Sequence, residues 1–179
     1  MLDKSVPFIS FTMFRPSNAP SLPDIQLPEG YKIKFYRPGD EKDWCRIETA
    51  VLEFSTEEDA AEYFEHSFTP YKKELEKRML FVENPKGEKV ATFTAWWTED
   101  NSPRLHWLGV IPEEQRKGLA RALTICVSKL LHEYYPDQDL YLTTQTWSHH
   151  AVKLYESLYY QIFQNQDYQK ILDILKRTN

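Results

Sequence analysis

From residue 31 onward, apolar residues recur alternately at the period of strands and at the period of helices. Runs rich in β-branched and aromatic residues predict strands at 31–36, 79–83, 89–97, 104–111, 140–146 and 161–166. Helical spacing predicts helices from Asp40, the expected N-cap, to Phe54, and over 55–68, 71–78, 118–135 and 151–159. The last segment, 168–179, has helical spacing in a short run and stays ambiguous.

The order of these elements predicts the fold class α/β, with helices on the faces of a central twisted mixed sheet. Turn residues at 84–87 join the strands 79–83 and 89–97 into an antiparallel hairpin. The strand 104–111, the helix 118–135 and the strand 140–146 form a βαβ unit. The two strands of that unit should therefore be parallel.

Residues 1–30 differ from the rest of the chain because they are rich in proline. These prolines are Pro7, Pro16, Pro20, Pro23 and Pro28. Proline lacks a backbone N–H and has a fixed φ, which argues against a regular helix or a central strand here. We expect an arm that packs over a single domain formed by 31–179. The expected anchors of the arm are Phe8, Ile9, Phe11 and Phe14.

Composition narrows the class of protein. The chain has 179 residues, of which 41% are hydrophobic and 27% charged, as in ordinary globular domains and unlike disordered or fibrous chains. It contains no run of 18 apolar residues, so no membrane-spanning helix is expected, and Pro7 interrupts the apolar N-terminus in a way that argues against a signal peptide. The net charge of −5 argues against a broad basic face for nucleic acid.

The two cysteines, Cys45 and Cys126, are too few for a disulfide framework or a four-ligand metal site. The histidines lack metalloprotease spacing, and we expect no metal. Reduced cysteines are typical of a cytoplasmic protein.

The segment 105–121 carries the clearest signal for a binding site. A strand runs through a short loop into a long helix, whose first backbone N–H groups lack partners and carry the positive end of the helix dipole. Gly118 and Ala120 let a ligand approach the backbone, and Arg116, Lys117 and Arg121 add positive charge. The pattern predicts an anion site for phosphate or pyrophosphate, although a solvated basic helix start would look similar. It matches neither a Walker A loop nor a dinucleotide fingerprint.

A second segment, 143–160, places another strand and helix beside the first pair. With both segments in view, the chain resembles the GCN5-related N-acetyltransferase (GNAT) family over about residues 31–166. The segment from Gln115 to Ala120 fits the family's pyrophosphate loop, Q/R-x-x-G-x-G/A. The later pattern N-x-x-A-x-x-L-Y-x-x-x-G-F is matched by Ala151, Leu154 and Tyr155.

Two positions depart from the later pattern. Ser148 replaces the asparagine, which weakens a contact to the pantetheine arm but leaves one hydroxyl donor, and Ser148 is also the expected cap of the helix. Tyr159-Tyr160 replaces Gly-Phe, which suggests a different turn after the helix.

The resemblance implies the GNAT fold and transfer of an acetyl group from acetyl-CoA to a primary amine through a tetrahedral intermediate. It implies that the strand ending at Val110 splays away from 140–146 and that the co-substrate enters the gap. The residues expected to bind acetyl-CoA are Leu108, Gly109, Val110, Gln115, Arg116, Lys117, Gly118, Leu119, Ala120, Arg121 and Ser148. Among them, backbone groups of Leu108 and Val110 would pair with the pantetheine and the acetyl carbonyl.

Tyr155 occupies the family's general-acid position, and its phenol would protonate the departing thiolate. The competing interpretation is simple packing on the sheet. His106 lies where some relatives, including serotonin N-acetyltransferases, carry a histidine that relays a proton, and in a regular strand it shares a face with Leu108 and Val110. A structural histidine is the alternative, and His149 and His150 are further candidates for substrate contact.

The acceptor amine is not identified by the sequence. Nine acidic residues in 41–65 would attract a cationic small molecule or peptide amine, although exposed helix faces are commonly charged in any case. Trp96, Trp97 and Trp107 are alternatives for an apolar acceptor pocket.

Two other functions stay open at this stage. One is a non-catalytic acyl-CoA-binding or regulatory module on the same fold, and the other is a structural domain without a CoA site. Exposed edge strands and the proline-rich arm are compatible with a homodimer.

Overall fold

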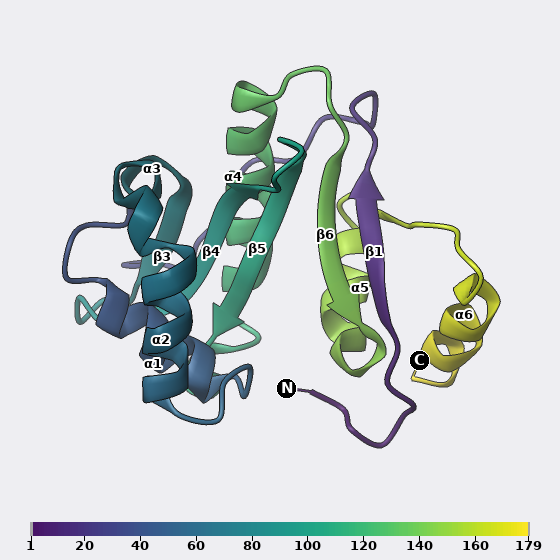
Figure 1. Ribbon diagram of the computed structural model, residues 1–179, viewed down its shortest axis with the longest axis horizontal. Helices are drawn as coiled ribbons and strands as arrows, with labels where there is room; N and C mark the ends of the chain where they lie inside the picture. The colour runs from purple at the N-terminus through teal and green to yellow at the C-terminus, as the bar shows by residue number, and fades with distance from the viewer. Residues whose placement is uncertain (1, 179) are drawn as a thin grey trace.

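The chain folds around one seven-stranded sheet with the strand order β2-β3-β4-β5-β6-β1-β7 (Figure 1). This arrangement is seen in a computed structural model, in which residues 2–178 are described. The strands are β1 (Ser10–Arg15), β2 (Lys32–Phe35), β3 (Met79–Glu83), β4 (Lys89–Trp97), β5 (Pro103–Val110), β6 (Leu140–Gln145) and β7 (Gln161–Ile162). The α-helices are α1 (Glu41–Ala50), α2 (Glu57–Ser67), α3 (Lys72–Arg78), α4 (Leu119–Tyr134), α5 (His149–Glu156) and α6 (Tyr168–Arg177).

From residue 31 onward the helices and strands follow the predicted order, and the mixed sheet is confirmed. β3 and β4 have the expected bounds and pair antiparallel. The first helix ends at Ala50 rather than Phe54, because the chain turns at Leu52, which has φ 69°. The ambiguous C-terminal segment forms helix α6. None of the helices in the described range 2–178 is long and apolar enough to cross a membrane.

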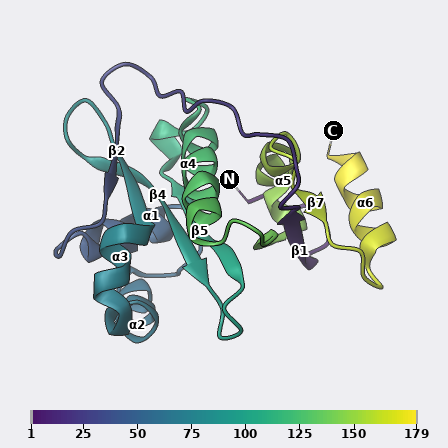
Figure 2. The ribbon, with the colours of Figure 1, turned by 90° about the horizontal axis from the view of Figure 1, so that it is seen from above.

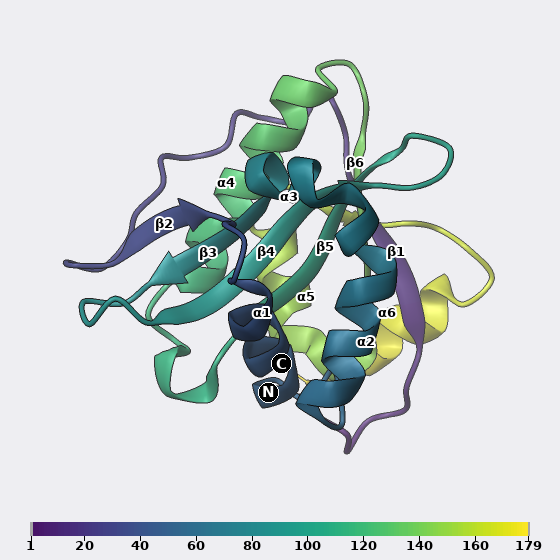
Figure 3. The same cartoon turned by 60° about the vertical axis from the view of Figure 1, so that its left-hand side comes forward.

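Helices cover both faces of the sheet, as the view from above shows (Figure 2). On one face lie α1, α2 and α3, whose apolar residues form a core with Trp44, Phe68 and Phe81 at its centre. On the other face, α4 and α5 bury residues such as Leu123 and Val152 in a second core. Figure 3 shows α1 and α2 in front of the strands. A site that lies within the sheet is therefore bordered by two different sets of helices.

The proline-rich N-terminal segment corrects the prediction of an arm outside the sheet. Residues 10–15 form strand β1, which lies between β6 and β7 and pairs antiparallel with both. Phe11 and Arg15 are buried, and the Arg15 Nε–H donates to the Leu158 carbonyl at 3.2 Å. Of the four expected anchors, Phe8 is instead 54% exposed. The prolines stop short of the strand at either end, so its backbone donors are intact.

The parallel pair of strands predicted for the βαβ unit is present, but β5 and β6 pair only near the start of β5 in the described chain. Between residues 2 and 178, the single register pair that joins β5 to β6 is Arg104 with Tyr141. Beyond it the two strands diverge toward the C-terminal end of β5, as Figure 1 shows. The sheet therefore has an internal gap, bordered by strand edges that would otherwise bond to each other.

Candidate functional site

The loop before α4 presents backbone N–H groups toward open space. Gly118 has φ 83° and caps the helix, and the first bond within the helix runs from the Ala122 N–H to the Gly118 carbonyl at 3.0 Å. The N–H groups of the residues between them lie in the turn that no helical carbonyl satisfies. A Cβ added to Gly118 would meet no described atom within 4 Å. The geometry is that of an anion site at a helix N-terminus.

Several side chains of this loop bond to other parts of the protein and so fix the conformation of the loop. Gln115 Nε2 donates to the Val110 carbonyl at 2.9 Å, which ties the loop to the end of β5. Lys117 Nζ lies 2.7 Å from Glu114 Oε2 in an ion pair, and the Tyr31 hydroxyl donates to the same oxygen at 2.6 Å. Hydrogen bonding from Lys117 and Tyr31 lowers the pKa of Glu114. The sequence analysis missed Tyr31 and Glu114 because nothing local links residue 31 to residue 114.

The other two predicted cations, Arg116 and Arg121, differ in their contacts. Arg116 is exposed and has φ 65°, so the loop contains two left-handed residues close together, an arrangement that gathers backbone N–H groups. Arg121 Nη1 donates to Ser157 Oγ at 2.7 Å and so bridges α4 to the end of α5. The side chain of Leu119 is buried in the core, so only its backbone is available to a ligand.

Beyond Arg104, the edge of β5 that faces β6 has no register pair with that strand in the described chain. The Ile111 N–H bonds to the Val90 carbonyl on β4, and alternation along the strand then turns the N–H of Val110 the opposite way, toward the gap. Leu108 and Gly109 precede it on the same strand, and Gly118 follows at the anion loop. A strand edge that leads to a helix N-terminus is the arrangement that the family resemblance implies for acetyl-CoA.

Tyr155 lies on α5, buried at 6% exposure, with its ring 5.9 Å from that of Tyr160. Its hydroxyl makes no hydrogen bond with any of the residues described, whereas the Tyr160 hydroxyl lies 2.7 Å from Ser128 Oγ. Burial raises the pKa of Tyr155, and the charges of Tyr160, Glu53 and Glu48 raise it further. The phenol is therefore protonated at neutral pH and has a free donor.

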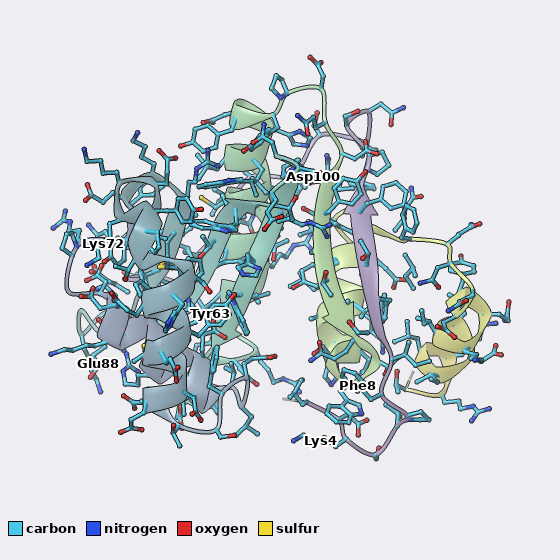
Figure 4. All side chains as sticks on the ribbon, in the orientation of Figure 1. Lys4, Phe8, Tyr63, Lys72, Glu88 and Asp100 are labelled. Carbon is cyan, nitrogen blue, oxygen red and sulfur yellow. The ribbon has the colours of Figure 1, made fainter. Side chains whose placement is uncertain are left out.

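His106 does not share a face with Leu108 and Val110, which corrects the prediction from a regular strand. The register of β4 with β5 shifts between Thr92 and Thr94, and Trp107 in the facing stretch has φ 57°, so β5 contains a bulge. The bulge turns both His106 and Trp107 toward α2. Tyr63, labelled in Figure 4, lies there: its hydroxyl is 3.2 Å from His106 Nε2 and accepts from Trp107 Nε1 at 3.1 Å.

The surroundings of His106 make it a weak base. Burial, with a smaller contribution from the charge of Arg104, lowers the pKa of His106 to about 4. The imidazole therefore stays neutral at physiological pH, and a proton taken from an amine would be held poorly.

The two residues expected to cap helices, Ser148 before α5 and Asp40 before α1, make no side-chain capping bond in the described chain. Ser148 is the N-cap residue, but its side chain makes no capping hydrogen bond within the described chain, which leaves the hydroxyl available to a ligand. Asp40 likewise caps α1 without a side-chain bond, because its carboxylate pairs with Lys89 Nζ at 3.0 Å. His149 is buried with Nε2 3.4 Å from Asp3 Oδ2, and His150 is exposed.

The turn after α5 contains a residue with a left-handed backbone. Tyr159, at the position where the pattern has glycine, has φ 69°. A side chain therefore occupies a backbone conformation that L-residues rarely adopt, and whether the turn differs from that of other family members stays a prediction.

Glu48 is one of the nine acidic residues in 41–65, and its burial was not expected from the sequence. It lies on α1 and is fully buried, and neither carboxyl oxygen has a hydrogen-bond partner among residues 2–178. A Cβ on Gly109 would lie 2.8 Å from its Oε1, so the carboxyl rests against the backbone of β5 beside the gap. The signal was present: residue 48 follows Trp44 by four positions and so stands on the apolar stripe of the helix.

Within the described part of the chain, no group of three or more His, Cys, Asp or Glu side chains is arranged to hold a metal ion. The two cysteines there are free thiols.

Comparison with known proteins decides the family. Residues 42–159 match the model of the acetyltransferase (GNAT) family. The chain belongs to the GNAT family. A relative in sequence is the mycothiol acetyltransferase of Rhodococcus erythropolis, 26% identical over 120 residues, which are 62% of this chain and 40% of that protein. The part of this GNAT chain that matches thus spans less than half the length of that relative.

Solved structures share the GNAT fold. The GCN5-related N-acetyltransferase from Sphaerobacter thermophilus superposes with a TM-score of 0.71 at 20% identity, covering 88% of this chain and 49% of that chain. A GNAT-family acetyltransferase from Colwellia psychrerythraea gives a TM-score of 0.64 at 13% identity, over 88% of this chain and 55% of that one. Family and fold are confirmed, and the family uses acetyl-CoA. The roles of individual residues stay predictions.

Proposed function

We propose that this GNAT protein transfers an acetyl group from acetyl-CoA to a primary amine. The observation that carries the proposal is that, among the residues described, β5 has no register pair with β6 beyond Arg104 and leads into the loop that opens α4 at Gly118. A buried phenol with an unused donor, Tyr155, stands on the helix that follows β6. The proposal therefore puts the binding surface and the proton donor together beside the gap between β5 and β6.

The chain's own groups would act as follows. Backbone N–H groups from Arg116 to Ala120 would hold the pyrophosphate, and the free edge of β5 at Leu108 and Val110 would pair with the pantetheine and the acetyl carbonyl. A fixed N–H aimed at the developing oxyanion is worth about 3 kcal/mol. Ser148 would offer its hydroxyl to the arm. Tyr155 would protonate the departing sulfur.

The acceptor would approach from the face of α1 and α2. The exposed acids on α2 are Glu57, Glu58, Asp59, Glu62 and Glu65. Their charge favours a cationic amine over an anionic one, by attraction that salt weakens. Trp96 and Trp97 line a separate hollow of about 620 Å³ near Asp100, the residue labelled at the β4–β5 turn in Figure 4.

Thermal unfolding with acetyl-CoA tests the binding site first. A ligand present at 100 times its Kd stabilises the native state by about 2.7 kcal/mol, which raises the Tm of a domain of this size by several degrees. Gly118→Trp should abolish the rise, because the indole would fill the space over the helix start. Gly87→Trp is the matched control: Gly87 also has a left-handed φ, of 82°, with nothing within 4 Å of an added Cβ, but it lies in the β3–β4 turn.

No rise in Tm for the unaltered protein, or equal rises for both tryptophan variants, would refute the acetyl-CoA site at this loop. A rise without acetyl transfer to any primary amine would instead support the alternative function, a non-catalytic acyl-CoA-binding module. That alternative has the replaced asparagine position, Ser148, in its favour.

A further inference from the structure

Glu48 is a buried acidic group that no structural partner explains. Its side chain is 0% exposed, and both oxygens lack a hydrogen-bond partner among the residues described. A carboxyl group in such a position lowers the stability of the folded protein, because burial removes its hydrogen bonds to water and no protein donor replaces them. A structural role would normally supply such a donor. Burial, helped by the charge of Glu53, raises the pKa of Glu48 well above its usual value.

The position of Glu48 relates it to the gap. The close approach of its carboxyl to Gly109 requires glycine there, since an added Cβ would lie 2.8 Å from Oε1 and 2.7 Å from Ile47 Cγ2. Glu48 belongs to the α1 face of the sheet, and Tyr155 packs in the core of the opposite face. The charge of Glu48 nevertheless contributes to the raised pKa of Tyr155. The carboxyl and the phenol therefore lie within electrostatic reach of each other, on opposite sides of the open part of the sheet.

Other buried polar groups without a partner in the described chain lie on β4, next to β5, and on α1. Thr92 pairs in register with Gly109, and Thr94 with His106. The hydroxyls of both threonines and Trp44 Nε1 are buried without a partner in the described chain. This concentration of unsatisfied polar atoms beside one strand is expected of a place that receives a polar group.

We propose that Glu48 is the group that deprotonates the acceptor amine. This rests on the proposed acetyl transfer, and it moves the base from His106 on β5 to helix α1. A primary alkylamine arrives as an ammonium ion, which cannot attack a carbonyl. Beside a carboxylate in a site of low dielectric, the neutral pair of carboxylic acid and free amine is favoured over the ion pair, so the proton passes from nitrogen to Glu48.

The protons and bonds then balance. The free amine forms a C–N bond with the acetyl carbon, and the C–S bond breaks. Tyr155 gives its proton to the leaving sulfur, and the second proton lost by nitrogen restores the phenol. The proton on Glu48 is released to solvent once the amide has left. No other reactant is needed.

Two probe amines of different basicity test this role. Benzylamine is an ammonium ion at pH 7, whereas aniline is already neutral. Glu48→Gln keeps the shape of the side chain but cannot accept the proton, so we expect kcat/KM for benzylamine to fall about 100-fold and that for aniline to change less than about threefold. Raising the pH should restore the benzylamine rate, because each unit increases the free amine about tenfold. Glu133→Gln, an exposed carboxyl on α4, is the matched control.

The outcomes separate the two proposals. If the unaltered protein acetylates neither amine, acetyl transfer to small amines fails and the role of Glu48 fails with it. Suppose that transfer occurs, but that Glu48→Gln has the same kcat/KM values as the unaltered protein, or that kcat/KM falls equally for both amines. The proposal for Glu48 is then overturned, and the proposed acetyl transfer stands. The acetyl-CoA-induced rise in Tm should be unchanged in Glu48→Gln. Gly109→Ala, which displaces the carboxyl, should reproduce the selective loss of benzylamine turnover.

Discussion

Two buried tyrosines that lie close together differ in what their hydroxyl groups contact. Tyr160 is bonded to Ser128 Oγ at 2.7 Å, whereas Tyr155 has no partner in the part of the chain described. An unused donor contributes nothing to stability, and a hydrogen bond between neutral groups contributes about 1 kcal/mol. The free phenol is therefore the one that can serve a reaction.

Phenylalanine substitutions at these two positions should have opposite effects. Tyr155→Phe should lower acetyl transfer about 100-fold through loss of the general acid, with Tm and the acetyl-CoA-induced shift unchanged. Tyr160→Phe should lower the free energy of unfolding by about 1 kcal/mol and leave turnover intact. Steady-state kinetics and thermal melts check both. Equal turnover in Tyr155→Phe and the unaltered protein would remove Tyr155 from the mechanism.

Prediction at this scale was right for the local geometry of the loop before α4, whose binding role stays a prediction, and wrong where a bulge intervenes. The loop from Gln115 to Ala120 depends on neighbouring residues and was found from their spacing. The face of His106 was wrong because one extra residue in β5 reverses the alternation. Glu48 was counted among surface acids, although its place on the apolar stripe of α1 marked it as buried.

At the scale of elements, the end of α5 carries a local strain. Tyr159 has φ 69°, which costs an L-residue of this kind about 1 kcal/mol, and its side chain is 44% exposed. Its neighbour Tyr160 must nevertheless point into the core to reach Ser128. The turn is thus imposed by packing on both sides of it.

Tyr159→Gly should relieve the strain and raise the Tm by about 2–4 °C. The gain is limited by the greater freedom of glycine in the unfolded chain. Differential scanning calorimetry measures it. Gly118→Ala, which introduces a side chain at φ 83°, should shift the Tm downward by a similar amount. A lower Tm for Tyr159→Gly would mean that contacts of the ring outweigh the backbone strain.

At the scale of the whole molecule, the N-terminal strand β1 joins β6 and β7 to each other within the sheet. β1 separates β6 from β7, and the chain then crosses over the α4 and α5 side to reach β2, as Figure 2 shows. Leu22 and Leu27 in this crossing pack against the core. Without β1, the strand that borders the gap would lose its only long pairing, because β5 bonds to β6 at one position within the residues described.

Two phenylalanines of the N-terminal segment should therefore contribute very differently. Phe11→Ala removes a ring that is 3% exposed and should cost about 3–5 kcal/mol. Phe8→Ala, at 54% exposure with one edge contact to Trp147, should cost about 1 kcal/mol. Chemical denaturation of both variants gives the comparison. Similar losses would argue for the loosely packed arm that the prolines suggested.

The sequence was sufficient for the order of elements from residue 31 onward, for the hairpin and for the βαβ unit, because each depends on periodicity or spacing within a short stretch of chain. Residues 42–159 also carry the family. Only the tertiary structure placed β1 inside the sheet, turned His106 toward Tyr63, tied Lys117 to Glu114 and buried Glu48 against Gly109. These features depend on contacts between residues far apart in the chain, and on a bulge whose position follows from packing rather than from the pattern of side chains.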